Sequence, residues 1–261
     1  MKNINEIFDK NANLNKNKPL FWFKPDLDWV SISWSEASNE KKKLIQILKS
    51  LKIKKGDKVS IIAQNSPRWC IADLSIMSLG GITVPGYITS NEDELLYLLN
   101  HSESKIAFVS SDILSKIEKV FKKLLFLKHI ICFDELNKKI KKFNVFNYED
   151  LLKKFDFEKI VLTNKFQEVD KNDLACIIYT SGTSARPKGV MLTHGSIIEN
   201  IKGAKKFVDE IEGSNHKFVS ILPLSHAYEH TGGFLLPILI GGEIYFSNNR
   251  EQLLSDLQFA K

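Results

Sequence analysis

Cysteine, arginine and long apolar runs are scarce in this chain of 261 residues, and each scarcity argues against a class of protein. Cys70, Cys132 and Cys176 stand far apart among apolar neighbours, which argues against zinc sites and disulfides and favours reduced, packed thiols in the cytosol. The three arginines form no basic arm of the kind that nucleic-acid binders carry. The longest apolar runs, such as 234–240, are too short to span a bilayer.

The positive charge of the chain comes almost entirely from lysine and amounts to a net +6. The lysines are scattered in short runs such as 41–43 and 138–142, a distribution typical of solvated faces. We therefore expect a cytoplasmic protein with no nucleic-acid partner. Peripheral contact with the anionic inner face of the membrane stays open.

Segments of strand length alternate with segments of helical periodicity along most of the chain. Strands are expected over 59–63, 82–84, 105–109, 129–133, 174–179, 189–192, 217–222 and 243–246. Helices are expected between most of them, and such alternation is typical of parallel βαβ units in an α/β fold. Residues 134–170 are more polar and irregular, with one helix near 148–155.

Local signals mark several helix ends. The pair Ser66-Pro67 begins an apolar helix, the pair Gly80-Gly81 ends it, and Asp73 inside it needs a buried donor. Ser90 and Asp93 resemble a capping box for the next helix. Other expected segments are helices over 112–127, 196–209 and 231–240, a helix from 251, and a short helix with a loose lead-in over 1–18 before a packed region from 32.

Residues 179–194 carry the strongest signal in the chain. They read Tyr-Thr-Ser-Gly-Thr-Ser-Ala-Arg-Pro-Lys-Gly-Val-Met-Leu-Thr-His and follow an apolar strand. A loop rich in hydroxyl groups and glycine, with two cations nearby, offers the donors and the charge that a polyphosphate needs. A Walker A loop is excluded, because Pro187 replaces its second glycine and no Ser or Thr follows Lys188. A polar surface turn is the alternative.

With this loop, the sequence resembles the AMP-forming, adenylate-forming enzymes, the superfamily of acyl-CoA synthetases and luciferases. Ala185 departs from the pattern, since the family has glycine there, and a positive φ at alanine costs on the order of 1 kcal/mol. Two more stretches, 65–90 and 222–229, resemble the long-chain fatty acyl-CoA synthetase branch. The first begins Asn-Ser-Pro-Arg-Trp, and the second reads Leu-Pro-Leu-Ser-His-Ala-Tyr-Glu.

The resemblance implies a fold and a reaction. The fold is an incomplete N-terminal AMP-binding domain over 1–261, with mixed, largely parallel sheets and flanking helices. Its first α/β unit would occupy 1–170, and 171–261 would hold the phosphate loop and the start of a second unit. The reaction is ATP-dependent activation of a long-chain fatty acid, through an acyl-adenylate, to acyl-CoA. AMP and pyrophosphate are released, and Mg²⁺ and CoA are required.

The resemblance also implies the site residues. The nucleotide phosphates would be bound by Thr180, Ser181, Gly182, Thr183, Ser184, Lys188 and Gly189. Lys188 would also supply charge to catalysis. His226 would lie beside the reacting carboxylate, as a hydrogen-bond donor or as a wall of the acyl pocket. For His226, a core histidine bonded to backbone is the alternative.

The family's downstream motifs do not follow in this chain, among them the Tyr-Gly-x-Thr-Glu that supplies an acidic partner for magnesium. No metal ligand is therefore expected here. We expect the N-terminal part of such an enzyme, from a truncated frame, a fragment or a split gene. Three functions stay open: a long-chain fatty acid:CoA ligase or part of one, an adenylate-forming ligase for another acid, and a non-catalytic nucleotide-binding module that pairs with a separate C-terminal half.

Overall fold

The computed structural model describes residues 2–26, 28–136, 143–154, 168–180, 186–210, 216–247 and 253–260. Within these ranges the strands form a seven-stranded sheet of order β7-β6-β5-β3-β4-β8-β9 and a four-stranded sheet of order β10-β11-β1-β2. The strands are β1 Pro19–Phe23, β2 Val30–Ser33, β3 Lys58–Ile62, β4 Ile82–Pro85, β5 Ile106–Val109, β6 His129–Cys132, β7 Asn144–Asn147, β8 Leu174–Thr180, β9 Lys188–Thr193, β10 Lys217–Ser220 and β11 Glu243–Phe246.

Both sheets are largely parallel. Among the described strands, the antiparallel pairs are β8–β9 and β1–β2, and the other pairs are parallel. The small sheet unites distant parts of the chain, because Phe21 of β1 pairs with Ile244 of β11. The α/β fold with mixed, largely parallel sheets and flanking helices is confirmed.

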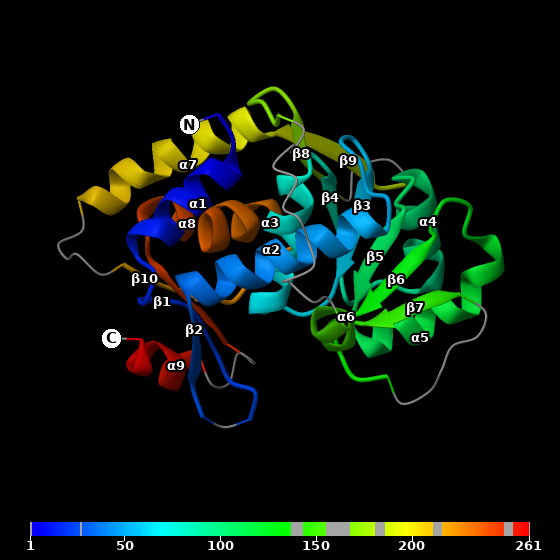
Figure 1. The fold of residues 1–261 in the computed structure, drawn as a ribbon, viewed down its shortest axis with the longest axis horizontal. Coiled ribbons are helices and arrows are strands. Elements are labelled where there is room, and N and C mark those ends of the chain that lie inside the picture. The colour runs from blue at the N-terminus through cyan, green and yellow to red at the C-terminus, as the bar shows by residue number, and fades with distance from the viewer. Residues whose placement is uncertain are drawn as a thin grey trace.

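Helices fill the space between the sheets and cover their outer faces (Figure 1). The helices are α1 Ile4–Leu14, α2 Trp34–Ser50, α3 Pro67–Ser78, α4 Glu92–His101, α5 Ser111–Val120, η1 Phe121–Lys123, α6 Tyr148–Lys154, α7 His194–Asp209, η3 Glu229–Leu235, α8 Leu236–Ile240 and α9 Leu253–Phe259. Helices α2 and α3 pack on each other and on strands of both sheets, so they form the central layer. Two tryptophans of this layer, Trp34 and Trp69, are almost fully buried.

The signals around α3 are confirmed. The Ser66 hydroxyl accepts from the backbone N–H of Trp69, and Pro67 is the first residue of the helix. Gly80 has a φ of +67°, a left-handed conformation that glycine adopts at little cost and that ends the helix. The buried donor that Asp73 needs is His230, whose Nε2 lies 2.9 Å from the Asp73 carboxylate.

Two predictions, one near the N-terminus and one at α4, are wrong in part. The short helix predicted within residues 1–18 is present as α1, but it is not a loose lead-in, since Ile4, Ile7 and Phe8 on one of its faces are buried in the main core. The capping box of α4 joins Asn91 and Glu94 rather than Ser90 and Asp93. Asparagine caps a helix as well as serine does, so two adjacent candidates competed and composition could not separate them.

The helix predicted over 112–127 is shorter than expected. Helix α5 ends at Val120 and is followed by the single turn η1. The side chain of Asn100 explains the end, because it donates to the Lys123 carbonyl at 2.9 Å and accepts from the Leu125 N–H at 2.9 Å. A side chain from α4 thus satisfies backbone groups that a continued helix would have bonded internally.

Other segments differ in their type. Strands β1, β2 and β7 were not predicted, because each is short and has no regular alternation of apolar and polar residues. The helix predicted over 231–240 is a π-helix, η3, followed by α8.

His194 generates a prediction about stability and pH. It is the first residue of α7 and fully buried, and burial lowers the pKa of its imidazole from 6.5 to about 4. As the pH falls, the unfolded chain therefore takes up a proton on His194 before the folded chain does. The free energy of unfolding is unaffected by His194 above pH 6.5 and falls progressively from pH 6.5 to pH 4. At about 1.4 kcal/mol per pKa unit, the loss amounts to roughly 3 kcal/mol.

His194→Gln removes this dependence. Urea unfolding at a series of pH values should show that the free energy of unfolding of the natural chain falls more steeply from pH 6.5 to 4 than that of the variant. Parallel curves for the two proteins would contradict the prediction.

Candidate functional site

The predicted phosphate loop closes a β-hairpin. Strands β8 and β9 are antiparallel, and Thr180 at the end of β8 pairs with Lys188 at the start of β9. Ser181, Gly182, Thr183 and Ser184, together with Ala185, lie outside the described residues. Thr180 and Lys188 are both exposed, so the hairpin presents a hydroxyl and an ammonium group on either side of its mouth.

Gly189 has a packing reason to be glycine. A Cβ atom there would lie 2.7 Å from Cγ2 of Ile177 and 3.3 Å from the Tyr179 ring. The close approach of β9 to β8 at this point therefore requires a residue without a side chain. This requirement fixes the register of Lys188, the residue before it, against Thr180.

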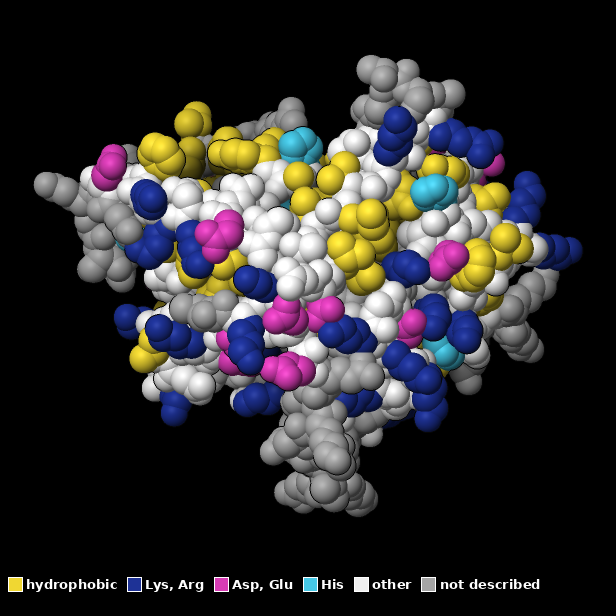
Figure 2. All heavy atoms as spheres, turned by 90° about the horizontal axis from the view of Figure 1, so that it is seen from above, with side chains coloured by type: hydrophobic (Ala, Val, Ile, Leu, Met, Phe, Trp, Pro, Cys, Tyr) yellow, Lys and Arg dark blue, Asp and Glu magenta, His cyan; other side chains and the backbone are white. Residues whose placement is uncertain are grey.

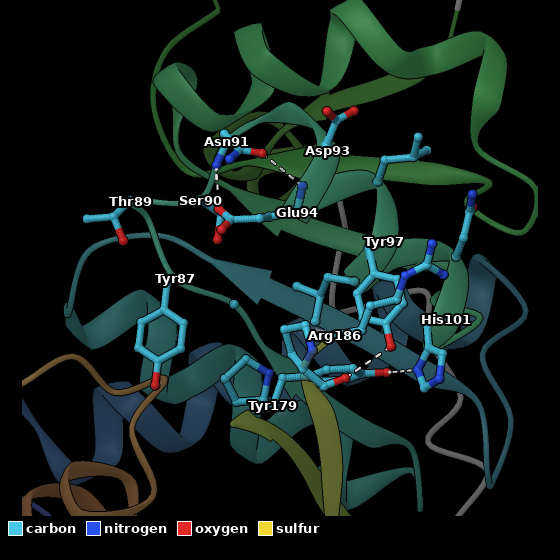
Figure 3. A pocket seen from close by; sticks show the side chains of 16 residues that line it. Tyr87, Thr89, Ser90, Asn91, Asp93, Glu94, Tyr97, His101, Tyr179 and Arg186 are labelled. Atoms are coloured by element: carbon cyan, nitrogen blue, oxygen red, sulfur yellow. Dashed lines mark hydrogen bonds between the residues drawn. The ribbon is translucent and has the colours of Figure 1, made fainter. Parts of the chain in front are cut away.

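Helix α4 holds the two arms of the hairpin (Figure 3). The Tyr97 hydroxyl donates to the Pro187 carbonyl at 3.0 Å, and the Arg186 guanidinium stacks 5.7 Å from the Tyr97 ring centroid. On the β8 side, the Tyr179 hydroxyl lies 2.7 Å from Nδ1 of His101, and burial raises the pKa of Tyr179 to about 12. Both ends of the loop thus rest on side chains one helical turn apart.

A cavity of about 780 Å³ lies beside the hairpin, between α4 and the segment that follows β4. Its walls combine aromatic rings with groups of both charges, and Tyr87 lies across it from His101 (Figure 3). The size is in the range of small-molecule sites. The cavity places a ligand-sized space directly against Arg186 and Pro187, at the exit of the loop.

His226 lies in the turn between β10 and η3. Its backbone N–H donates to the Pro223 carbonyl at 2.8 Å, and its Nδ1 accepts from the Tyr228 N–H at 3.3 Å. The side chain is exposed, so His226 is not a core histidine. The Nδ1 contact leaves Nε2 as the position that carries the proton in the neutral ring.

The hairpin and the His226 segment come to the same edge of the seven-stranded sheet. Thr180 ends β8, which runs parallel to β4 and, through it, to β3. Asn65 follows β3, and its side chain donates to the Leu222 carbonyl at 2.7 Å. The carboxyl ends of parallel strands are where open α/β sheets bind ligands.

Sequence reasoning gave no role to two groups near His226, the buried His230 and the partly buried Asn65. Glu229, the last residue of the motif 222–229, is buried beside His230. The signal for His230 was indirect, since a buried Asp73 required a donor. The partner of Asn65 had no signal, because it lies more than 150 residues away in the sequence.

The surface offers no concentrated basic patch on the face seen in Figure 2. Lysine and arginine side chains are spread over that face among acidic groups and small apolar areas (Figure 2). Within the part of the chain that the structure describes, no helix has the length and apolar character to cross a membrane. Among the described side chains there is no group of three or more His, Cys, Asp or Glu residues that could hold a metal ion.

Comparisons with known proteins relate this chain to one family of enzymes. The family model described as "AMP-binding enzyme" matches residues 8–260. Long chain acyl-CoA synthetase 3 of Arabidopsis thaliana is 29% identical over 86% of this chain and 35% of its own length. Long-chain-fatty-acid–CoA ligase 5 of Rattus norvegicus is 30% identical over 98% of this chain and 39% of its own length. A long-chain-fatty-acid–[acyl-carrier-protein] ligase of Arabidopsis thaliana is 28% identical over 89% and 32%.

A solved structure shows the same fold. The anthranilate CoA ligase AuaEII, in complex with anthranoyl-AMP, superposes with a TM-score of 0.83 at 20% identity. The match covers 98% of this chain and 46% of that one. The chain spans about a third of the length of the curated relatives named above. The resemblance seen in the sequence is thereby confirmed, and the chain belongs to the AMP-binding enzyme family of adenylate-forming ligases.

Proposed function

We propose that this chain is the part of a long-chain fatty acid:CoA ligase that binds ATP and the fatty acid and brings them together. One observation carries the proposal: the hairpin mouth at Thr180 and Lys188 and the turn with His226 lie at the same edge of one sheet. The names of two of the relatives, which are long-chain acyl-CoA ligases, support a fatty acid as the substrate.

In the proposed reaction, the fatty-acid carboxylate attacks the α-phosphorus of ATP. A bond forms between the carboxylate oxygen and phosphorus, and the bond to pyrophosphate breaks. Lys188 offsets negative charge on the phosphates, while Thr180 and the hydroxyl-rich loop from Ser181 to Ser184 donate hydrogen bonds to them. Gly189 keeps β9 close enough to β8 for this arrangement.

His226 would bind the carboxylate end of the fatty acid. Its Nδ1 accepts a backbone hydrogen bond, so Nε2 is free to donate to a carboxylate oxygen and to fix the direction of attack. The sulfur of CoA then attacks the acyl carbon of the acyl-adenylate, so that the thioester bond forms, the bond to AMP breaks and AMP leaves. Mg²⁺, when bound with ATP, would neutralise charge on the phosphates.

A second candidate is a nucleotide-binding module that works with a separate C-terminal half. One observation favours it: Ala185 stands where the family has glycine. A ligase for another carboxylic acid is a third candidate, because the structural neighbour is an anthranilate CoA ligase in complex with anthranoyl-AMP. For all three, we propose a cytoplasmic protein, and for the fatty-acid ligase also peripheral contact with the membrane into which the fatty acid partitions.

The choice among these functions can be tested with stable acyl-adenylate analogues. Acyl-adenosine sulfamates that carry palmitoyl, butyryl and anthraniloyl groups are titrated into the chain by calorimetry, together with ATP. We expect the palmitoyl compound to bind at least about tenfold more tightly than the butyryl one, since each buried CH₂ contributes about 0.8 kcal/mol. Equal affinity for the three analogues would contradict the fatty-acid assignment. If the chain binds none of the analogues and no ATP, the proposal of adenylate formation is contradicted.

Lys188→Ala should weaken ATP binding and leave fatty-acid binding unchanged. A hydrogen bond to a charged group contributes about 1.5–3 kcal/mol, so the dissociation constant for ATP should rise by roughly 10- to 100-fold. The control is Lys202→Ala, since Lys202 is an exposed lysine on α7 that pairs with Glu199 at 2.8 Å. Equal losses of ATP and fatty acid would indicate misfolding, and an unchanged affinity for ATP would remove Lys188 from the site.

A further inference from the structure

The segment that carries His226 is attached to α3 at two points, one on each side of the histidine. Asn65, directly before the N-cap of α3, holds residues 220–224. Asp73, in the middle of α3, holds His230. We propose that Asn65 and Asp73 are positioning residues that fix His226 against the acyl carboxylate, an inference that rests on the proposed function.

The first attachment uses both donor hydrogens and the acceptor oxygen of one side-chain amide. Nδ2 of Asn65 donates to the Ser220 hydroxyl at 3.0 Å and to the Leu222 carbonyl at 2.7 Å. Oδ1 of Asn65 accepts from the Leu224 N–H at 2.9 Å. Two donors and one acceptor therefore fix the backbone up to two residues before His226, and a shift of this turn would break several bonds together.

The second attachment is a buried pair. Nε2 of His230 lies 2.9 Å from Oδ2 of Asp73, and both side chains are fully buried. The backbone N–H of His230 donates to the His226 carbonyl at 3.0 Å. Because the Asp73 carboxylate holds the His230 ring, this hydrogen bond also holds the His226 carbonyl in place. Trp69 of α3 packs edge-on against the same ring, with centroids 5.9 Å apart.

Glu229 connects the two attachments. Its carboxylate accepts from the Ser220 hydroxyl at 2.7 Å, and burial raises its pKa. The Glu229 side chain also fills the space next to Gly233, where a Cβ atom would lie 2.4 Å from Oε1. Glu229 is also the first residue of the π-helix η3, and π-helical turns often mark functional sites.

A purely structural role is the competing explanation. The network is costly to bury, and buried ionic groups frequently add little to stability compared with apolar ones. The hydrogen bonds of this network hold the backbone on both sides of the exposed His226. They are directional, whereas an apolar contact of the same area would not fix the direction of the His226 side chain. The two explanations differ in one measurable respect: positioning acts through the His226 ring, and stability does not.

The test is a double-mutant cycle read out by palmitoyl-adenosine sulfamate binding. Asn65→Asp removes both donors and keeps the acceptor and the shape of the side chain. We expect about tenfold weaker binding of the analogue in the natural background and less than twofold weakening in the His226→Ala background, with ATP affinity unchanged within twofold. Asn147→Asp is the matched control, because Asn147 also donates to a carbonyl at 2.8 Å and accepts a backbone N–H at 3.0 Å, on β7 at the far edge of the sheet.

Each outcome decides between the explanations. Equal weakening in both backgrounds, or none in either, would overturn the positioning role. Failure of the natural chain to bind the analogue at all would instead reject the proposed function. If Asn65→Asp does not fold, as judged by thermal melting against Asn147→Asp, the same cycle is run with Asp73→Asn, which keeps an acceptor for His230 and removes the charge. A fold-change that does not depend on His226 again overturns the proposal.

Discussion

The layer formed by α2 and α3 between the two sheets is the constraint on which the rest of the structure depends. Both sheets pack against this layer, and its tryptophans Trp34 and Trp69 are almost fully buried. Side chains of that size contribute several kcal/mol each when they leave water, so the sheets cannot separate or slide without a large loss. Because α3 also begins at the carboxyl end of β3, the same layer brings the turn of the small sheet to the hairpin of the large one.

Polar contacts then define the site within that apolar frame. Asn65 and the buried pair of Asp73 and His230 join α3 to the turn that carries His226. On the opposite side, α4 holds the mouth of the hairpin through Tyr97 and His101. Such directional bonds contribute little net stability, about 1 kcal/mol each, but they determine where a side chain points. The proposed chemistry needs this directionality, because adenylation depends mainly on how two substrates are positioned.

Much of the fold could be predicted from the sequence because its central strands are continuous apolar runs bounded by turn residues. Strands β3, β5, β6 and β8 belong to this class. The strands β1, β2 and β7 were missed, since each is short and lacks a regular alternation of apolar and polar residues, and β1 also depends on a distant partner, because Phe21 pairs with Ile244. Helix ends were lost where a distant side chain decided them, as Asn100 does after Val120.

The candidate site, like the fold, could be predicted only in part from the sequence. The resemblance indicated Thr180, Lys188 and His226, and the structure places the hairpin and the histidine turn at one sheet edge. The resemblance could not indicate the hydrogen bonds that position the turn with His226. Asn65 and Leu222 are 157 residues apart, and a single sequence carries no information about such a pair. The roles of Thr180, Lys188 and His226 with ATP and the fatty acid are proposals. Ser181 to Ser184 lie outside the described residues.

The most direct measurement of the central claim is hydrogen–deuterium exchange of the chain with and without palmitoyl-adenosine sulfamate. If the hairpin and the His226 turn form one site, the amides of residues 174–193 and 217–230 should become protected together, while those of β7 should not change. Protection of only one of these two segments, or protection confined to β7 and its neighbours, would contradict a shared site at the carboxyl edge of the large sheet.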